Sequence, residues 1–379
     1  MDLKTKVPAL LAALILGLPI AAQAQFTYFT NADNTITITR YAGSSAEVAI
    51  PASINGLPVT SIGAFAFDYN SSLTGITIPN SIINIGSYAF SDCDHLNSVT
   101  IPDGVINIGN DAFQSCYSLT NVTIPESVTN IELGAFNGCA GLIAINVDVA
   151  NSFYSSVHGV LFDKDQATLI QYPIGNMAAY YTIPDSVTNI GDGAFQYSYG
   201  LTNVTIPNSV FNIGNYAFQS CYDLTNVTIP GSVTNIAFGV FELCRGLIAI
   251  NVDATNSFYS SIHGALFDKD QTTLIQYPIG NTALSYTIPD SVTNIGEDAF
   301  SSCINLNHVT IPESVISIGD GAFAATALTC VKIPDSVECI GSLNSLSAGA
   351  FVNCNNLTNI TIGNHVTSIG SDTFAGCYN

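Results

Sequence analysis

A 23-residue pattern repeats along most of the chain and sets what the chain can fold into. Residues 96–118 read LNSVTIPDGVINIGNDAFQSCYS, and residues 119–141 read LTNVTIPESVTNIELGAFNGCAG. Thirteen units fit a working consensus of LTNVTIPxSVTNIGxxAFxxCxx. A unit this short cannot bury its own apolar side chains, so neighbouring units must stack and share one continuous core. The units begin at Ser45, Leu73, Leu96, Leu119, Leu142, Ala178, Leu201, Leu224, Leu247, Ala283, Leu306, Leu328 and Leu357.

Each unit contains two short extended stretches and an apolar return. In LTNVTIP, polar Thr123 lies between apolar Val122 and Ile124, which predicts a strand with one buried face. The proline that follows cannot donate to a strand ladder and therefore ends the strand. The SVTNIG stretch predicts a second short extended segment. The AFxxC stretch predicts a turn-like or helical return that packs its Ala, Phe and Cys inside.

Two units carry extra residues. The spacing between unit starts is mostly 23 but is 36 after Leu142 and after Leu247, and the two longer units lie 105 residues apart. Duplication of a four-unit block explains why residues 154–176 and 259–281 are almost identical. Within them GVLFDKDQATLIQYP predicts strand, polar turn and strand, so we expect a protruding β-hairpin rather than a duplicated active site. Its turn residues are candidate contact tips for a protein partner: Asp163, Lys164, Asp165, Asp268, Lys269 and Asp270.

The N-terminal stretch MDLKTKVPALLAALILGLPIAAQAQ has the layout of a secretory signal. Lys4 and Lys6 precede a short apolar run, and Ala22-Gln23-Ala24 gives a small-residue cleavage pattern. We expect cleavage after Ala24, which leaves 355 residues (379 − 24), and export to the extracellular space, the cell surface or the periplasm. We expect no membrane span in the mature chain, because no later segment is long and apolar enough. Residues 25–44 are predicted to form a capping hairpin ahead of a solenoid over residues 45–379.

The charge of the mature chain restricts its partners. Without the signal, 5 basic and 27 acidic residues give a formal charge of 5 − 27 = −22. Such a chain repels phosphate backbones, so nucleic acid is not an expected partner. Charged residues are nevertheless only 9% of the chain and hydrophobic residues 47%, so the chain has ample material for a packed core.

The cysteines follow the repeat. Where other units have Cys, Ser198 and Ala325 occupy the position, which indicates a small buried slot and free thiols. No C-x-x-C pair is present, so the pattern is not that of a zinc site. Cys330 and Cys339 lie outside this column, and they could form a disulfide with each other or remain free. The column contains Cys93, Cys116, Cys139, Cys221, Cys244, Cys303, Cys354 and Cys377.

No catalytic, cofactor or metal site is indicated. The chain has no G-x-S-x-G, no H-E-x-x-H, no phosphate-binding glycine loop and no dinucleotide fingerprint. An acid often follows the proline, and stacking would align these acids into a stripe. The stripe is compatible with calcium binding, but no loop has the alternating oxygen ligands of a calcium motif, so turn stabilisation and solvation are favoured. These acids are Asp103, Glu126, Asp185, Asp290, Glu313 and Asp335.

The units resemble leucine-rich repeats of the BspA-like bacterial type, whose pattern is LxxIxIPxxVxxIxxxAFxxCxx. The resemblance covers roughly residues 45–379 and is specific, because thirteen units carry it. It implies a right-handed β/α superhelix with a parallel concave sheet, short convex strands and short helical turns. It also implies a secreted or cell-surface protein that binds host or neighbouring-cell proteins, as an adhesin does.

The strand residues between the buried positions form the candidate binding face. They are polar and neutral, and we expect them to line the concave side. A carbohydrate- or matrix-binding module without catalysis is the alternative, in which Tyr154, Tyr172, Tyr259 and Tyr277 near the inserts would supply aromatic contacts. The candidate residues of the face are Ser98, Asn121, Thr123, Asn203, Thr205, Asn226, Thr228, His308, Thr310 and Asn359.

The last unit, residues 357–379, shows no polar cap. A solenoid needs one to shield its last core surface. We therefore expect shielding by oligomerisation or a reading frame that continues beyond Asn379.

Overall fold

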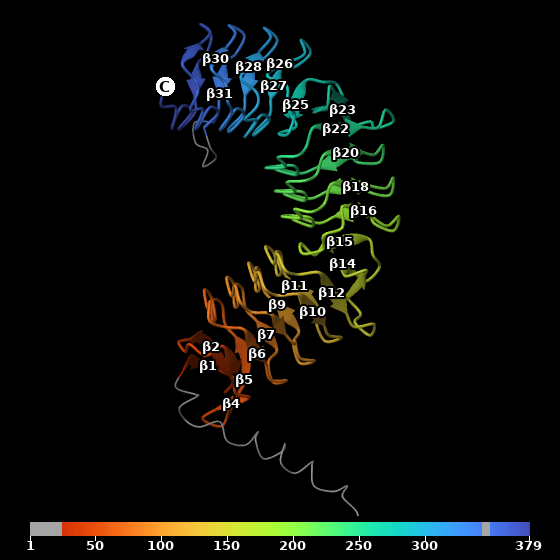
Figure 1. Cartoon of the computed structure of the whole chain (residues 1–379), viewed down its shortest axis with the longest axis vertical. Coiled ribbons are helices and arrows are strands. Elements are labelled where there is room, and N and C mark those ends of the chain that lie inside the picture. The colour runs from red at the N-terminus through yellow and green to blue at the C-terminus, as the bar shows by residue number, and fades with distance from the viewer. Residues whose placement is uncertain (1–24, 343–348) are drawn as a thin grey trace, which may run out of the picture. The chain divides into compact units, whose positions relative to one another are not determined.

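The computed structural model describes residues 25–342 and 349–379, and the signal predicted for residues 1–24 lies outside them. Within the described part the chain coils once per repeat unit (Figure 1), and each coil contributes a first and a second strand, with further strands in the first coil and in the two coils that carry inserts. The coils fall into two compact units, Met1–Lys164 with Pro173–Gly175 and Asp165–Tyr172 with Asn176–Asn379. We describe each compact unit by itself.

The LTNVTIP stretch of each unit forms the first strand of its coil. The pairing is parallel and shifts by one repeat, so that Asn203 faces Asn226 on the next strand. The first strands are β3 (Glu47–Ala49), β6 (Gly75–Thr77), β8 (Ser98–Val99), β10 (Asn121–Ile124), β12 (Ala144–Val147), β16 (Tyr180–Thr182), β18 (Asn203–Thr205), β20 (Asn226–Ile229), β22 (Ala249–Val252), β26 (Ser285–Thr287), β28 (His308–Thr310), β30 (Cys330–Lys332) and β32 (Asn359–Thr361). They pair in the orders β3-β6-β8 and β10-β12 in the first compact unit, and β16-β18-β20-β22, β26-β28 and β30-β32 in the second.

The NIG stretch forms the second strand of each coil, again in parallel register. Its asparagines stack, and Asn235 donates to the side-chain oxygen of Asn212 at 2.6 Å. The second strands are β5 (Leu57–Ile62), β7 (Asn84–Ile85), β9 (Asn107–Ile108), β11 (Asn130–Ile131), β15 (Thr168–Gln171), β17 (Asn189–Ile190), β19 (Asn212–Ile213), β21 (Asn235–Ile236), β25 (Thr273–Gln276), β27 (Asn294–Ile295), β29 (Ser317–Ile318), β31 (Cys339–Ile340) and β33 (Ser368–Ile369). At the N-terminal side, β1 (Phe26–Thr30) pairs antiparallel with β2 (Ile36–Tyr41), β2 pairs in parallel with β5, and β4 (Ser53–Ile54) pairs antiparallel with β5.

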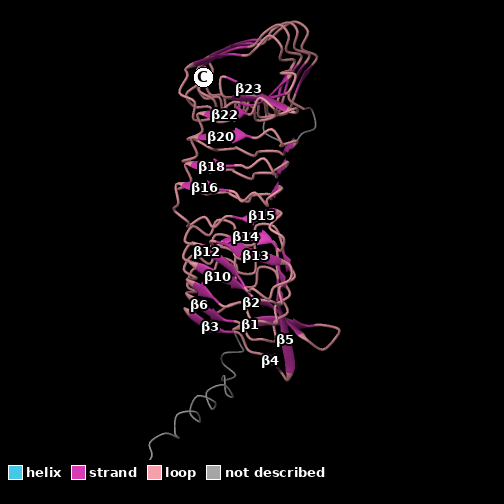
Figure 2. Cartoon of the chain, turned by 90° about the vertical axis from the view of Figure 1, so that its right-hand side faces the viewer, coloured by secondary structure: helices cyan, strands magenta, loops and turns pink. Residues whose placement is uncertain are grey.

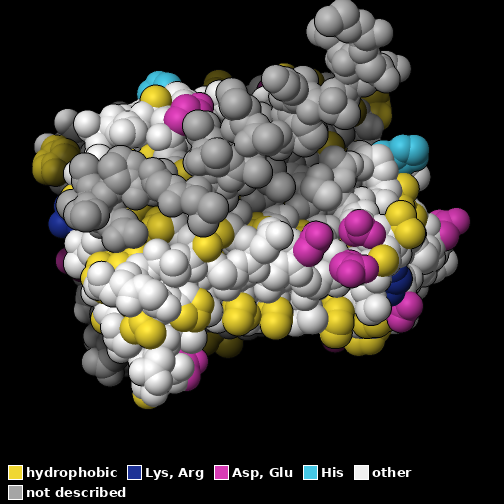
Figure 3. Space-filling model, turned by 90° about the horizontal axis from the view of Figure 1, so that it is seen from below, with side chains coloured by type: hydrophobic (Ala, Val, Ile, Leu, Met, Phe, Trp, Pro, Cys, Tyr) yellow, Lys and Arg dark blue, Asp and Glu magenta, His cyan; other side chains and the backbone are white. Residues whose placement is uncertain are grey.

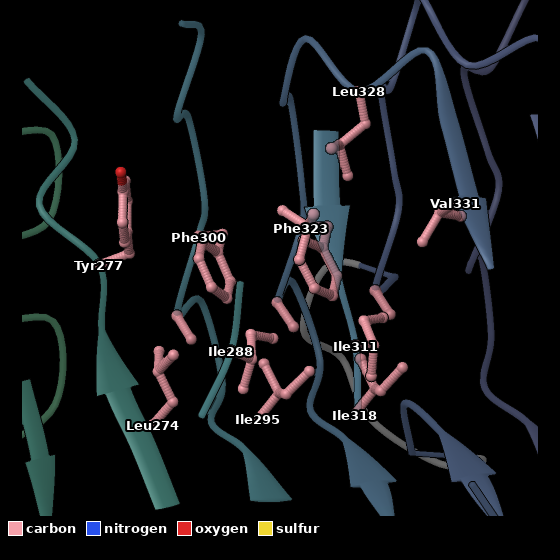
Figure 4. Packing of buried hydrophobic residues seen from close by; sticks show 14 of the residues in the cluster. Leu274, Tyr277, Ile288, Ile295, Phe300, Ile311, Ile318, Phe323, Leu328 and Val331 are labelled. Atoms are coloured by element: carbon pink, nitrogen blue, oxygen red, sulfur yellow. The ribbon is translucent and has the colours of Figure 1, made fainter. Parts of the chain in front are cut away.

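Between the two strand rows lies the core, which is built from columns of identical side chains. In the second compact unit Phe300 stacks on Phe323 with ring centroids 5.0 Å apart, and Tyr277 stacks on Phe300 at 5.2 Å (Figure 4). Ile295 and Ile318 of the second strands lie below these rings and are equally buried. Each ring therefore fills the space between two neighbouring coils, which is how a short unit shares its core.

The expected short helical turns are not found in the described residues, where Figure 2 shows strands and loops only. The AFxxC returns are turns instead, for two physical reasons. Alternate amides bond to the next coil, as from Phe90 N to Ala112 O at 2.8 Å, and those between them bond three residues back, as from Ala89 N to Gly86 O at 3.2 Å, which is not the four-residue pattern of an α-helix. Each return also carries left-handed residues, such as Tyr216 at φ 54° and Ser220 at φ 58°, which no α-helix contains.

The cysteine column is buried except for the partly exposed Cys377, and all ten cysteines are free thiols, which leaves Cys330 and Cys339 unbridged. One assignment in this column was wrong. Ala325 has a φ of 53°, which matches the left-handed Ser302 directly before Cys303. Thr326, which is 4% exposed, therefore holds the cysteine position in this coil, and the shorter spacing of 22 residues had hidden the offset.

The inserts belong to the core. Strands β13 (Tyr154–Val157) and β14 (Val160–Asp163) form an antiparallel hairpin in the first compact unit, and β23 (Tyr259–Ile262) and β24 (Ala265–Asp268) form its copy in the second. A strand before the predicted hairpin was thus missed, while the predicted pairing is confirmed in the second copy, where Leu266 faces Gln276 on β25. The expectation that the hairpin protrudes is wrong, because Leu266 and Phe267 are at most 1% exposed.

Candidate binding face

Outward side chains of the first strands form a polar face. In β20, Val227 and Ile229 are at most 1% exposed, while Asn226 and Thr228 between them are exposed. The predicted residues behave in the same way, since nine of the ten are exposed and Asn203 is partly exposed. Sequence alternation was therefore enough to find the solvent side of these strands.

Register aligns these polar side chains into columns. Thr182 faces Thr205 across the β16–β18 pair, and Thr228 faces Asn251 across the β20–β22 pair. The row before each column is tied to the backbone, as Thr202 Oγ1 donates to Ala179 O at 2.8 Å. The face thus presents amide and hydroxyl groups at a regular spacing on a backbone that is held on both sides.

Two hollows on this face lie in the second compact unit. The larger, of about 720 Å³, lies over β16, β18 and β20 and brings Thr205 and Thr228 together with Asp185 and Asp253. The smaller, of about 430 Å³, lies over β28, β30 and β32. It is lined by residues of the predicted set, by Thr361 of the same threonine column, and by two residues that sequence reasoning missed. Its polar lining is His308, Thr310, Cys330, Lys332, Asn359 and Thr361. Cys330 and Lys332 replace the usual Asn and Thr of the two columns, which was the signal that could have found them.

Acidic side chains dominate the charge around the face. All six acids that follow the prolines are exposed. Some are engaged, as Asp335 Oδ1 accepts from Asn364 N at 2.8 Å and Glu313 lies 3.7 Å from Lys332 Nζ. In the described residues no group of three or more His, Cys, Asp or Glu side chains could hold a metal ion. Figure 3 shows Asp and Glu side chains at several places on the visible surface and few Lys or Arg.

The predicted hairpin tips are partly used by the fold. In the second copy, Asp268 accepts from Thr272 N at 2.7 Å and from Thr273 N at 2.9 Å, which closes the turn. Lys269 Nζ donates to the main-chain oxygen of Asn256. Asp165 and Asp270 are exposed, and Lys164 is also exposed but donates to the main-chain oxygen of Asn151. Asp163 is partly exposed at the end of β14.

The four tyrosines suggested for aromatic contact with a ligand are used by the fold instead. Tyr172 and Tyr277 are 1% and 2% exposed because they replace the core Phe of the return, and burial raises the pKa of each to about 12. The hydroxyl oxygens of Tyr154 and Tyr259 accept main-chain N–H bonds from the preceding coil. Tyr172 and Tyr277 therefore offer no ring face to a ligand, whereas Tyr154 and Tyr259 are partly exposed and tied to the fold through their hydroxyls.

A different aromatic strip lies on the surface of the second compact unit. Tyr199 and Tyr222 occupy the same position in adjacent coils, are 39% and 36% exposed, and have ring centroids 4.9 Å apart. The guanidinium carbon of Arg245, from the next coil, lies 5.3 Å from the Tyr222 centroid. We call Tyr199, Tyr222 and Arg245 the tyrosine strip. Sequence reasoning missed it because the position lies in the variable part of the repeat.

The family model for the BspA type leucine rich repeat region matches residues 48–164, 176–286 and 282–379, with six copies. The chain belongs to the BspA-type leucine-rich repeat family. Among solved structures, this BspA-type chain is similar to a leucine-rich cell surface protein from Faecalibacterium prausnitzii, at 31% identity over 93% of this chain and 91% of that one, with a TM-score of 0.54. It also shares its fold with a leucine-rich repeat protein from Eubacterium ventriosum, at 22% identity over 93% of both chains and a TM-score of 0.56. Comparison with the curated proteins gives no match.

Residues 25–342 and 349–379 contain no helix that is long and apolar enough to cross a bilayer.

Proposed function

We propose that this BspA-type protein is exported and binds proteins of a host or neighbouring cell, as an adhesin, through the outward face of its first strands. The observation that carries the proposal is the alignment of neutral polar side chains over the larger hollow, where Thr205 and Thr228 lie beside Asp185. A rigid backbone that presents amides and hydroxyls in register favours hydrogen-bonded recognition with little ordering cost. The exposed insert residues Asp165 and Asp270 are proposed as secondary contacts.

The family supports this proposal. BspA-type repeats are binding scaffolds in general, and the similar Faecalibacterium protein is described as a cell surface protein. The proposal includes no catalysis. His158 and His263 sit at φ 51° as the first turn residues of the insert hairpins, which is a structural role. Hydrolytic turnover that disappears when both histidines are changed would contradict the non-catalytic part of the proposal.

Binding of the purified chain to immobilised matrix and cell-surface proteins, and to a glycan array, tests the proposal. Thr228→Arg places a large cation at the hollow and is expected to abolish protein binding. Thr234→Arg is the matched control, because Thr234 is exposed in the same coil but precedes the second strand. Equal loss in both variants, or no binding to any protein, would contradict the proposed face. Fractionation of cells that express the chain tests the export.

Glycan binding is the second candidate, and the tyrosine strip favours it. Two exposed tyrosine rings 4.9 Å apart can stack against the C–H face of a sugar ring, and Arg245 adds hydrogen-bond donors beside them. Tyr222→Ser is expected to abolish glycan binding, while Tyr117→Ser, at the same repeat position in the first compact unit, leaves it unchanged. Selective binding to glycans alone, sensitive to Tyr222 and not to Thr228, would replace the adhesin proposal with this one.

A further inference from the structure

Cys330 differs from every member of the cysteine column in its place on the fold. It lies on first strand β30, in the outward column that is usually Asn, and is exposed. The neighbouring member of that column on β28 is His308, also exposed, and the Cys330 Sγ lies 3.9 Å from the His308 Nδ1. Two departures from the repeat thus bring a thiol and an imidazole together on one exposed face.

The surroundings of this pair are open and include one Lys–Glu ion pair. Both side chains line the smaller hollow of about 430 Å³, which leaves room for a bound group above the sulfur. Lys332, two residues along the same strand, lines the hollow as well, and its Nζ lies 3.7 Å from Glu313. On the other side β32 contributes Asn359, which faces Cys330 and carries no charge. An accessible thiol with an imidazole beside it is the usual setting of a nucleophilic cysteine.

The thiols of the cysteine column lie in the core, apart from the partly exposed Cys377. Cys93 is fully buried, donates to Phe67 O at 3.2 Å, and has a pKa raised to about 12 by burial. Cys339 is partly exposed on second strand β31, where its register neighbours are Ser317 and Ser368. The histidine neighbour therefore distinguishes Cys330 even from the other accessible thiols.

We propose that Cys330 and His308 form a thiol modification site that takes a disulfide as its substrate. His308 accepts the proton of the Cys330 thiol, and the thiolate attacks one sulfur of R–S–S–R′. The Cys330–S–S–R bond forms while the S–S bond of the substrate breaks, and R′S⁻ leaves and takes the proton from His308. The substrate disulfide is the oxidant, so the exchange balances without another reactant. A disulfide-bearing small molecule or partner protein would thereby become covalently attached beside the polar face. This inference does not rest on the proposed adhesin function.

Labelling of the native, reduced chain with the aromatic disulfide 5,5′-dithiobis(2-nitrobenzoic acid) tests the site. We expect one fast-reacting thiol at pH 7, identified by peptide mass spectrometry as Cys330 and lost in Cys330→Ser. Cys339→Ser is the control and leaves the fast phase intact. The full set of ten thiols should become reactive only after denaturation, which shows that the fast phase belongs to the native fold.

His308→Asn restores the usual residue of the column, so the variant should fold, and it separates activation from mere exposure. We expect the Cys330 rate at pH 7 to fall about tenfold, because the variant lacks the imidazole that takes up the thiol proton. A Cys330 rate that is unchanged in His308→Asn, or a fast label on a different cysteine, would overturn the proposal.

Discussion

The Sγ of Cys244 lies 2.9 Å from the main-chain oxygen of Phe218, in the coil before it. The same contact recurs along the cysteine column, so the slot is more than a space for a small apolar residue. The thiol donates a weak hydrogen bond that ties one return to the previous one. It is made by Cys93, Cys116, Cys139, Cys221, Cys244, Cys354 and Cys377.

Ser198 occupies this slot without the bond. Its hydroxyl is buried and has no hydrogen-bond partner among the described residues. Ser198→Cys should therefore raise the free energy of unfolding by about 1 kcal/mol, because it removes an unpaired hydroxyl and the longer C–S bond brings the donor nearer to the preceding coil. The measurement is the urea midpoint. Cys221→Ser is the reciprocal control and should lower it, and a loss of stability in both variants would contradict the account.

The sequence predicted the strands well because their physics is local. Alternation around Val227 and Ile229 marks a buried side, and proline marks a strand end, so the thirteen first strands could be placed in advance. The shape of the returns could not be predicted, since it depends on hydrogen bonds to the next coil, as at Phe90. The burial of Tyr172 could not be predicted either, because the sequence places this aromatic residue beside a polar insert and does not show how the coil closes around it.

The candidate binding face could likewise be predicted only in part. Which columns face solvent followed from periodicity, and the exposure of Asn226 and Thr228 confirms it. Which columns come together in a hollow depends on register across several coils. The juxtaposition of His308 and Cys330 also requires this register, because the two residues are 22 positions apart and belong to different units.

Asn256 should be one of the most important polar residues of the second insert. It is 0% exposed, and its amide donates to Pro230 O and Val233 O and accepts from Phe258 N and Tyr259 N, at 2.8–2.9 Å. Asn256→Ala removes four hydrogen bonds to the backbone, two of them fully buried, so we expect a loss of at least about 3 kcal/mol in the free energy of unfolding.

Asn281, which is partly exposed and whose side-chain hydrogen bonds are open to solvent, is the matched control for this substitution. Asn281→Ala should change stability by less than about 0.5 kcal/mol, because its bonds can be replaced by water. Chemical denaturation followed by circular dichroism compares the two variants. Similar losses in both would show that Asn256 does not hold the insert.

Asp298 should make stability fall with rising pH. Partial burial and the nearby carboxylates of Glu242, Glu297 and Asp320 raise its pKa from 3.8 to about 6. The folded chain then binds more protons than the unfolded chain between these values, so its stability decreases as pH rises through this window. Asp298→Asn should stabilise the protein by about 1 kcal/mol at pH 7, a figure already reduced for solvent screening, and should have no charge effect below pH 4.

Asp290→Asn, at an exposed turn, is the control for this substitution. Denaturation curves at several pH values test the sign, and a gain from Asp298→Asn that is the same at all pH values would contradict it.

Replacing Tyr172 with phenylalanine should make the protein more stable. Its ring is 1% exposed and stacks on Phe195 at 5.3 Å, so the apolar part already fills the core position of the return. Its hydroxyl, however, is buried and has no hydrogen-bond partner among the described residues, and a buried polar group without a partner costs about 1–3 kcal/mol. Tyr172→Phe keeps the stack and removes the orphan group, so the free energy of unfolding should rise by about 1 kcal/mol. Tyr41→Phe should act with the opposite sign, because the Tyr41 hydroxyl donates to Gln25 Oε1 at 3.1 Å. Urea titrations of both variants against the parent chain make the comparison, and destabilisation by Tyr172→Phe would mean that its hydroxyl has a bonding role in the fold.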